Sequence, residues 1–334
     1  MLSLTLTGLL IKYLSNALLD IPNQRSSHSK PVLRGGGLGF ILAFAIAGII
    51  LAFSNFIQLE FTQANYISLW LGLFPLAIIG FLDDYRDISA HIRYLVQLSS
   101  ATIVIANFGI VPFPGLASWG IIGTVVATIL SLVAVTALIN FYNFMDGLDG
   151  FVASIAALQL CFLGFYLQQP IFFFLVAALL GFLWWNWSPA KIFMGDIGST
   201  VLGASVAIEL LSARQETLLA WSALTITFPL IGDTIYTLIC RILQGENIFE
   251  PHRTHIYQRL QQSGLTHPQV ATIYLITTSI FGTVIYYLGA VSIGINLLLT
   301  IIAIAIAEIY LKISNPNTQE IMSKRLERMS TNQD

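Results

Sequence analysis

The chain has 334 residues, of which 56% are hydrophobic and only 10% are charged, and its mean hydropathy is +0.79. A soluble domain carries about 25% charged residues, so this composition excludes a soluble globular protein. The net charge of −2 gives no basic field for nucleic acid, and two cysteines inside apolar stretches imply no disulfide framework.

Eleven apolar stretches follow one another along the chain. The length of each is close to the value of about 20 residues that a helix needs to cross a bilayer. We therefore predict an all-α, polytopic integral membrane protein with a single transmembrane domain over 1–312. The first stretch has neither a basic start nor a small-residue cleavage site, so we interpret it as a retained helix. The predicted spans are approximately 1–19, 38–58, 65–82, 94–110, 117–139, 151–168, 170–187, 197–213, 217–240, 268–289 and 291–312.

Lys and Arg indicate how the spans are oriented, because both are retained on the cytoplasmic side. Thirteen of them lie in connections after odd-numbered spans, whereas Arg214 alone follows an even-numbered span. This split predicts an N-terminus outside, a C-terminus inside and a cytoplasmic tail at 313–334. The polar loops predicted on the cytoplasmic face are 20–37, 83–93, 140–150, 188–196 and 241–267.

Three acids follow the third span: Asp83, Asp84 and Asp87. Adjacent carboxylates raise each other's pKa unless a cation is present. Mg2+ prefers carboxylate oxygens and takes water and substrate phosphates as its other ligands. The motif therefore predicts either a metal site or an acidic helix end with Arg86 as its local partner.

A second polar string, from Asn140 to Gly150, follows the fifth span. Asn143, Asp146 and Asp149 recur every three residues, so on a helix they form a slowly drifting polar stripe, and neighbouring glycines leave room for a ligand. The alternative is a polar loop that ends the span.

Asp196 lies between two glycines at the start of the eighth span, shortly after a polar segment that contains Asn186. A helix N-terminus with glycines and hydroxyls binds anions, and a carboxylate beside it can hold a metal. The alternative is a helix cap made by Asp196 or Ser199.

The segment from Pro251 to Leu260 carries two His and two Arg within eight residues, namely His252, Arg253, His255 and Arg259. Such cations can neutralise phosphates, which Arg can bind bidentately. The alternative is a basic loop attracted to anionic headgroups. A zinc site is disfavoured because no third ligand lies close by.

The first cytoplasmic loop combines Arg25, His28 and Arg34 with a glycine run at 35–37. This composition suits a pyrophosphate cradle or an anchor on the positive side of the membrane.

Three acids lie inside predicted spans: Glu209, Asp233 and Glu308. An acid at a span centre costs about 2.5–3.5 kcal/mol on insertion scales unless it finds a partner. We interpret these three as structural or substrate-path residues, and we expect a kink near Pro229 and Gly232.

In this order, the five polar sets resemble the polyprenyl-phosphate N-acetylhexosamine-1-phosphate transferase family (glycosyltransferase family 4), from Asp20 to Leu260. The opening loop is most similar to the O-antigen-initiating branch. The resemblance implies a bacterial inner-membrane enzyme of EC 2.7.8 type that uses Mg2+, with Mn2+ as the alternative. Its substrates would be a UDP-N-acetylhexosamine and undecaprenyl phosphate, its products UMP and a polyprenyl-diphosphate sugar, and a homodimer is compatible with it.

The resemblance also implies roles for single residues. Asp83 and Asp84 match paired aspartates that position metal and lipid phosphate, and Asp196 matches a magnesium ligand. Two positions depart from the family's histidine loop: His252 replaces an acid, and Tyr257 replaces a second histidine. The implied set is Asp83, Asp84, Asp146, Asp149 and His255 for catalysis; Arg25, His28, Arg34, Asn143, Asn186, Arg253 and Arg259 for substrate binding; and Asp196 and Asp84 for the metal.

A transporter or flippase for an anionic sugar or lipid is the competing interpretation. Transporters place ionisable groups near the midplane and are often built from repeated halves. Asp233 and Glu209 favour transport, whereas the lack of a repeat and the carboxylates at one face favour a transferase.

Overall fold

The computed structural model describes residues 1–14, 18–22, 31–53, 63–248, 250 and 252–314. The chain is 79% helical, which confirms the all-α prediction. The helices are α1 (Leu2–Tyr13), α2 (Gly37–Phe53), α3 (Gln63–Arg86), α4 (Ala90–Phe108), α5 (Gly120–Met145), α6 (Phe151–Tyr166), α7 (Phe172–Asn186), α8 (Gly195–Leu211), α9 (Thr217–Leu224), α10 (Phe228–Leu243), α11 (Ile256–Gln262), α12 (His267–Leu288) and α13 (Ser292–Ile313). Three short 3-10 helices, η1 (Leu116–Trp119), η2 (Thr225–Thr227) and η3 (Gly289–Val291), and two strands, β1 (Leu19–Asp20) and β2 (Val32–Leu33), complete the described elements.

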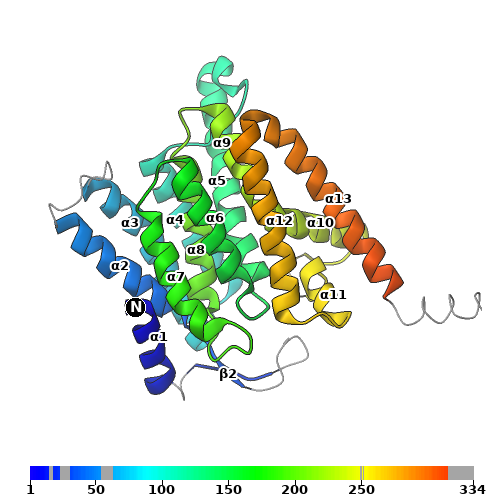
Figure 1. Ribbon diagram of the computed structural model, residues 1–334. Coiled ribbons are helices and arrows are strands. Elements are labelled where there is room, and N and C mark those ends of the chain that lie inside the picture. Colours follow the sequence, from blue (N-terminus) through cyan, green and yellow to red (C-terminus); the bar gives the residue numbers. More distant parts are fainter. Residues whose placement is uncertain (15–17, 23–30, 54–62, 249, 251, 315–334) are drawn as a thin grey trace, which may run out of the picture.

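Each of the eleven predicted spans contains at least one helix, and Figure 1 shows these helices packed into one bundle. Among the described residues, four helical stretches are long and apolar enough to cross a membrane: Tyr66–Arg86, Leu116–Met145, Thr217–Leu243 and His267–Ile313. Several others are apolar but shorter. α1 ends at Tyr13, well before the end of the predicted span 1–19, because Leu19 and Asp20 pair with β2 instead.

α8 is the central helix of the bundle. Every residue from Ile197 to Leu211 is buried, and α8 packs against α2, α3, α5 and α6. Its neighbours approach closely, since a Cβ added at Gly80 of α3 would lie 2.5 Å from the Cα of Ile197. This central position explains why polar residues interrupt the predicted span 197–213: α8 faces protein and not lipid.

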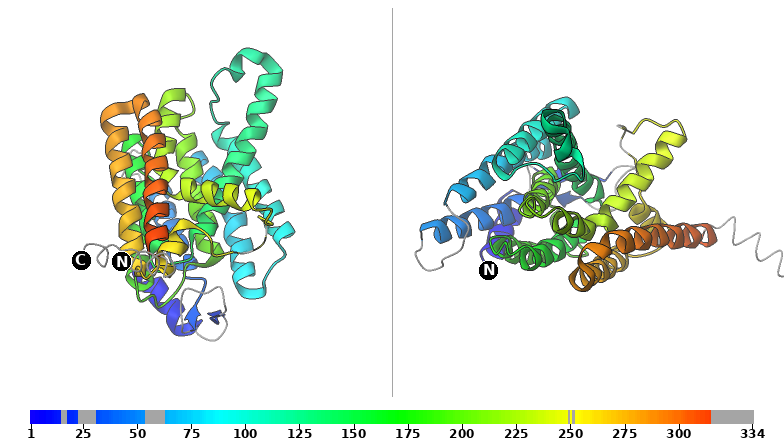
Figure 2. Two further views of the ribbon diagram at one scale, coloured as in Figure 1. Left: turned by 90° about the vertical axis from the view of Figure 1, so that its right-hand side faces the viewer. Right: turned by 90° about the horizontal axis from the view of Figure 1, so that it is seen from above.

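The ninth predicted span is broken. α9 ends at Leu224, η2 follows, and α10 then runs across the bundle (Figure 2). The expected kink is therefore present, and Pro229 occupies the first turn of α10, where its missing N–H costs nothing.

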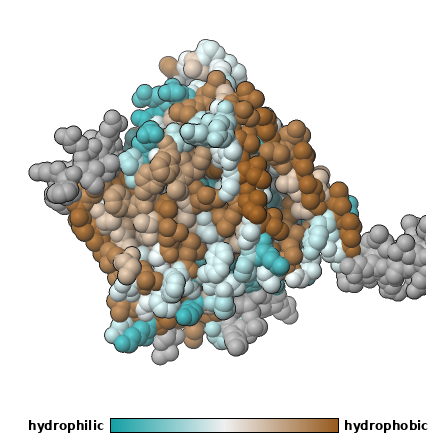
Figure 3. All heavy atoms as spheres, in the orientation of Figure 1, coloured by the Kyte–Doolittle hydropathy of each residue, from teal (hydrophilic) through white to brown (hydrophobic). Residues whose placement is uncertain are grey.

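The polar loops meet at one end of the bundle, the lower end in Figure 1. There β1 pairs antiparallel with β2, and Leu33 of β2 forms a parallel bridge with Ile192 in the loop after α7. Apolar side chains cover much of the outward surface of α12 and α13, and hydrophilic ones lie along the lower edge and at the upper left (Figure 3). Two of the loops predicted on one face, 20–37 and 188–196, thus meet at the same end of the bundle.

Candidate active site

Asp84 caps α8 from a different helix. Its Oδ1 accepts the backbone N–H of Asp196 at 3.0 Å, and its Oδ2 accepts the N–H of Ile197 at 3.4 Å. The approach requires a glycine at position 195, which has φ +72° and where a Cβ would lie 2.2 Å from Oδ2 of Asp84. The alternative that Asp196 or Ser199 caps this helix is therefore wrong. The residue at the cap position makes no side-chain hydrogen bond to the helix N-terminus, and Asp84 binds the free N–H groups instead.

Arg93, on α4, connects the two acidic motifs. Its Nη1 lies 2.6 Å from Oδ2 of Asp83 and 2.8 Å from Oδ2 of Asp196. The other oxygen of Asp83 accepts the N–H of Ile88 at 2.7 Å. Arg86, expected as the local partner, lies instead over the ring of Tyr85. The sequence carries one signal for this contact: Arg93 lies one turn into the helix that follows the acidic loop. Its charge predicted only the orientation of the spans.

The end of α5 reaches the same point. Asn143 donates from Nδ2 to Oδ2 of Asp196 at 3.0 Å. α5 stops at Met145, so Asp146 and Asp149 do not continue a helical stripe. Burial raises the pKa of Asp146 well above its usual value, and the negative charges of Asp196 and Asp84 raise it further. We call Asp83, Asp84, Arg93, Asn143, Asp146 and Asp196 the carboxylate half of the site.

Asp149 and Asn186 tie the neighbouring loops together. Asp149 accepts the N–H of Ala190 at 3.1 Å, and its Oδ1 lies 3.3 Å from Nδ1 of His267, a contact that the sequence did not reveal. Burial alone would raise the pKa of Asp149, but His267 and the Ala190 N–H hold it below the usual value. Asn186 is buried, donates to the carbonyl of Ile192 and accepts the N–H of Gly150. Both the donor and the acceptor of the Asn186 amide thus bond to backbone groups.

The glycine run of the first loop packs against the loop after α7. The N–H groups of Gly36 and Gly37 donate to the carbonyls of Phe193 and Met194 at 2.8 and 2.9 Å. A Cβ at Gly37 would lie 2.6 Å from the backbone of Gly198. These amides cannot also cradle a pyrophosphate, so that expectation is wrong for them. The glycines permit close approach of α2 and α8.

Of the three cations predicted in that loop, one falls within the described residues. Arg34 donates to Oδ1 of Asp20 at 2.7 Å, which bridges the two sides of the β1–β2 hairpin. Burial alone would lower the pKa of Arg34, but the hydrogen bond and charge of Asp20 raise it, and the charges of Asp84 and Asp196 add to the rise. Arg25 and His28 lie outside the described residues.

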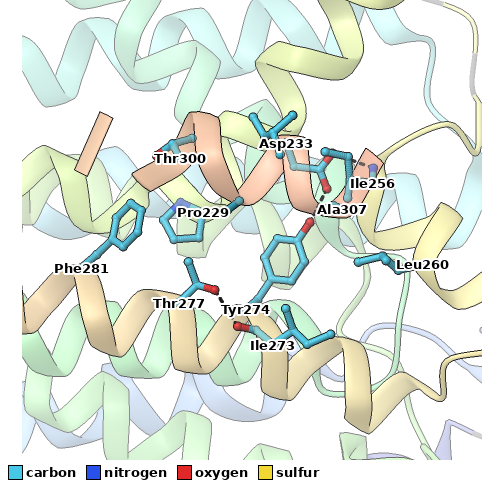
Figure 4. Close-up of a pocket in the computed structure, with 12 residues that line it drawn as sticks. Pro229, Asp233, Ile256, Leu260, Ile273, Tyr274, Thr277, Phe281, Thr300 and Ala307 are labelled. Atoms are coloured by element: carbon cyan, nitrogen blue, oxygen red, sulfur yellow. Dashed lines mark hydrogen bonds between the residues drawn. The ribbon is translucent and has the colours of Figure 1, made fainter. Parts of the chain in front are cut away.

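Asp233 of α10 holds the histidine loop. It is buried, and it accepts the N–H of Tyr257 at 3.0 Å. It also accepts the N–H of Ile256 at 2.8 Å and the hydroxyl of Tyr274 at 2.7 Å (Figure 4). His255 directly precedes these amides, and its Nδ1 lies 3.6 Å from Oδ1 of Asp233. Asp233 therefore has a structural position, one of the two roles expected for it. It also lines an apolar cavity of about 70 Å3 between α10, α12 and α13.

The remaining loop residues divide between neighbouring helices. Arg259 forms a bidentate pair with Glu308 of α13, which gives that intramembrane acid its partner. The carbonyl of Arg253 accepts from Nε2 of Gln262 at 3.1 Å. The ring of His252 lies 4.8 Å from that of His255. We call His252, Arg253, His255 and Arg259 the histidine half of the site.

Tyr257 joins the two halves. Its hydroxyl donates to the carbonyl of Phe144 at 3.0 Å, and its ring stacks on Phe151 with centroids 5.0 Å apart. A Cβ at Gly147 would lie 2.4 Å from that hydroxyl. The departure from the family pattern at this position thus docks the histidine loop onto the loop after α5.

The carboxylate half fits a hard divalent cation by its chemistry. Arg93 pairs with Asp83 and Asp196, and Asp84 and Asp146 lie close enough to Asp196 to add two more carboxylates. Carboxylate oxygens are the ligands that Mg2+ prefers. Within the described part of the chain, no three His, Cys, Asp or Glu side chains already converge as a finished metal site. Both oxygens of Asp84 accept backbone N–H groups, which leaves Asp196 as the better candidate ligand.

Comparisons with known proteins show which sequences this chain is similar to. The model of glycosyl transferase family 4 matches residues 66–214, which include the carboxylate half. A probable undecaprenyl-phosphate N-acetylglucosaminyl 1-phosphate transferase of Bacillus subtilis (strain 168) is 29% identical over 317 residues, 89% of this chain and 84% of that protein. An undecaprenyl-phosphate alpha-N-acetylglucosaminyl 1-phosphate transferase of Haemophilus influenzae is 30% identical over 311 residues, 85% of each chain. A phospho-N-acetylmuramoyl-pentapeptide-transferase of Aquifex aeolicus is 27% identical over 236 residues, 60% of this chain and 65% of that protein.

Proposed function

Because this chain belongs to the polyprenyl-phosphate N-acetylhexosamine-1-phosphate transferases of glycosyl transferase family 4, we propose that it transfers an N-acetylhexosamine 1-phosphate from a UDP-sugar to undecaprenyl phosphate. UMP is the second product. The observation that carries the proposal is the meeting of Asp83, Asp196 and Asn143 around Arg93, four residues from three distant segments. The relatives named for N-acetylglucosamine favour UDP-N-acetylglucosamine as the donor.

The reaction joins two phosphates, so its main physical demand is charge neutralisation. The lipid phosphate is already largely ionised near neutral pH, which leaves little work for a general base, and it attacks the β-phosphorus while UMP leaves. Arg93 and the cations of the histidine half can stabilise the charge on the phosphoryl oxygens. Asp84, which holds the N-terminus of α8, positions Asp196, so Asp83 or Asp146 remains to orient the lipid phosphate.

We propose Mg2+ as the cofactor, held by Asp196 together with Asp83 or Asp146, with Mn2+ as the alternative metal. A bound Mg2+ would offset the negative charge of the diphosphate. The support is the excess of carboxylates over cations in the carboxylate half, which leaves negative charge uncompensated. Burial raises the pKa of Asp146, and the charges of Asp196 and Asp84 raise it further, so the site holds more negative charge than its cations offset. Asn143 and Arg93 would keep the carboxylate of Asp196 in place whether or not the metal is bound.

We further propose that this site faces the cytoplasm of a bacterial inner membrane and starts an O-antigen-like cell-envelope glycan. The support is the distribution of Lys and Arg, because the loops at the site end carry nearly all of them. UDP-sugars are cytoplasmic metabolites, which agrees with that orientation. All four basic residues of the histidine half and all of those in the first loop belong to the loops predicted on this side.

Release of UMP tests the function directly. Purified protein in detergent would receive undecaprenyl phosphate, Mg2+ and, one at a time, UDP-linked GlcNAc, FucNAc or QuiNAc. We expect UMP and a lipid-diphosphate sugar with at least one donor, and none without the lipid. No UMP from any donor, combined with uptake of the sugar or lipid into proteoliposomes, would replace the proposal by transport, which none of the relatives described above supports.

A further inference from the structure

The break between α9 and α10 is held by two amide side chains from other helices. Gln159 of α6 donates from Nε2 to the carbonyl of Ile226 at 3.1 Å, and Asn296 of α13 donates to Oγ1 of Thr225 at 2.8 Å. Both amides are fully buried. At membrane depth, the carbonyls that a helix break sets free need partners from neighbouring groups, so these two side chains stabilise the bend.

Gln159 also binds the helix that leads to the carboxylate half. Its Oε1 accepts the hydroxyl of Tyr142, which is likewise fully buried. Tyr142 directly precedes Asn143, whose Nδ2 lies 3.0 Å from Oδ2 of Asp196. One amide therefore contacts α5 immediately before its functional end.

The other contact of Gln159 leads to the histidine half. Ile226 lies seven residues before Asp233, which is on the second turn of α10. Asp233 in turn accepts the N–H of Ile256, the residue after His255. Ile226 lies in η2, two residues before α10 begins at Phe228. The bend at Ile226 therefore sets the start of α10, and with it the place of Asp233 and of the histidine loop.

We propose that Gln159 is a positioning residue for the transfer reaction: its amide couples the placement of the carboxylate half to that of the histidine half. This inference rests on the proposed function. A buried position of α6 that merely packed against its neighbours would be filled by an apolar side chain, since polar groups inside a membrane are costly and mark function by default. Glutamine suits the coupling because one side chain supplies both the acceptor for Tyr142 and the donor for Ile226.

Substitutions at position 159 separate coupling from packing. Gln159→Met keeps the volume and loses both hydrogen bonds, so we expect kcat for UMP release to fall roughly 10- to 100-fold, as for a small misplacement of catalytic groups. KM for the UDP-sugar should change little. Gln159→Glu, neutral at this depth, keeps a donor and an acceptor and should restore most of kcat. Ser131→Ala is the matched control, because Ser131 is an equally buried residue of α5 whose hydrogen bonds, with Ala127 and Val111, reach neither half of the site.

A distance measurement tests the coupling between the two halves independently of enzymatic activity. Spin labels at Ala90 and Gln262, both exposed, would report the separation of the two halves in a background where Cys161 and Cys240 are replaced by alanine and turnover is retained. We expect a narrow distribution in the wild type and in Ser131→Ala, and a broader or shifted one in Gln159→Met.

Several results would overturn the proposal. These are wild-type kcat and distances in Gln159→Met, an equal loss of kcat in Ser131→Ala, or no rescue by Gln159→Glu. If Gln159→Met does not fold, Tyr142→Phe removes one of the two bonds and should show the same effects in smaller measure; wild-type behaviour of that variant would also overturn it. Absence of UMP release by the wild type with every donor refutes the proposed function alone, since the spin-label distances still test the coupling.

Discussion

Asp84 accepts the backbone N–H of Asp196 at 3.0 Å, although the two acids are 112 residues apart in the chain. Asp84 thus fixes the start of the central helix, whereas its neighbour Asp83 pairs with Arg93. These different contacts of two adjacent carboxylates determine which acids remain available for metal and substrate.

Removal of Arg93 should lower turnover most strongly. Arg93→Ala leaves Asp83 and Asp196 facing each other without a cation, and we expect kcat to fall by about 100-fold or more, as for loss of a preorganised donor. Arg93→Lys keeps the charge but not the planar guanidinium and should be intermediate. UMP release at saturating donor measures both. Arg86→Ala, at the exposed last residue of α3, is the control, and wild-type turnover in Arg93→Ala would contradict the assignment.

Removal of divalent metal should abolish transfer reversibly. A chelator in excess should stop UMP release, and added Mg2+ should restore it. In Asp196→Asn the restoring Mg2+ concentration should rise steeply or turnover should be lost, because the candidate ligand loses its charge. Asp87→Asn keeps an exposed position with φ 47° that asparagine tolerates, so its Mg2+ dependence should match the wild type. Full activity in chelator would rule out the metal proposal.

Loss of the Tyr257 hydroxyl should loosen the contact between the two halves. Tyr257→Phe leaves the Phe144 carbonyl without this donor, so we expect a loss of about 1 kcal/mol in the free energy of unfolding and a higher KM for the UDP-sugar. Thermal unfolding in detergent and donor titrations measure the two effects. Tyr287→Phe changes an exposed tyrosine and should alter neither; equal behaviour of the two variants would show that the hydroxyl has no role in docking the loop.

His252 should make the protein less stable in mild acid. Burial lowers its pKa to about 4, with the charges of His255 and Arg241 adding to the effect, whereas the unfolded chain has a pKa near 6.5. Because this pKa is depressed on folding, the contribution to stability is complete above about pH 6.5 and is lost as the pH falls toward 4. Melting temperatures at pH 7.5, 6 and 5 should therefore decline more in the wild type than in His252→Gln. His91→Gln, at an exposed site, should keep the wild-type slope, and identical slopes in all three proteins would contradict the prediction.

The helices and the shared end of the polar loops were predictable from the sequence because both are local properties. Runs of apolar residues mark helices wherever a bilayer excludes unpaired backbone groups. The span 217–240 was only partly predictable: Pro229 indicated a bend, but the break at Ile226 depends on Gln159 and Asn296 from two other helices. The role of the glycine run at 35–37 was not predictable, because glycine serves equally well for binding a phosphate and for close packing of backbones. Only the close approach of Gly198 shows that these glycines serve packing.

The amino-acid sequence by itself determined that this is a helical membrane protein whose acidic motifs lie at one face, since hydropathy and charge are read along the chain. Tertiary structure alone decided that Asp84 caps α8, that Arg93 bridges Asp83 and Asp196, and that Asp233 holds the histidine loop. The physical reason is the range of the interactions. A hydrogen bond or ion pair acts over about 3 Å, so its partners are chosen by how α3, α4, α8 and α10 pack, and that packing is set by contacts far apart in sequence.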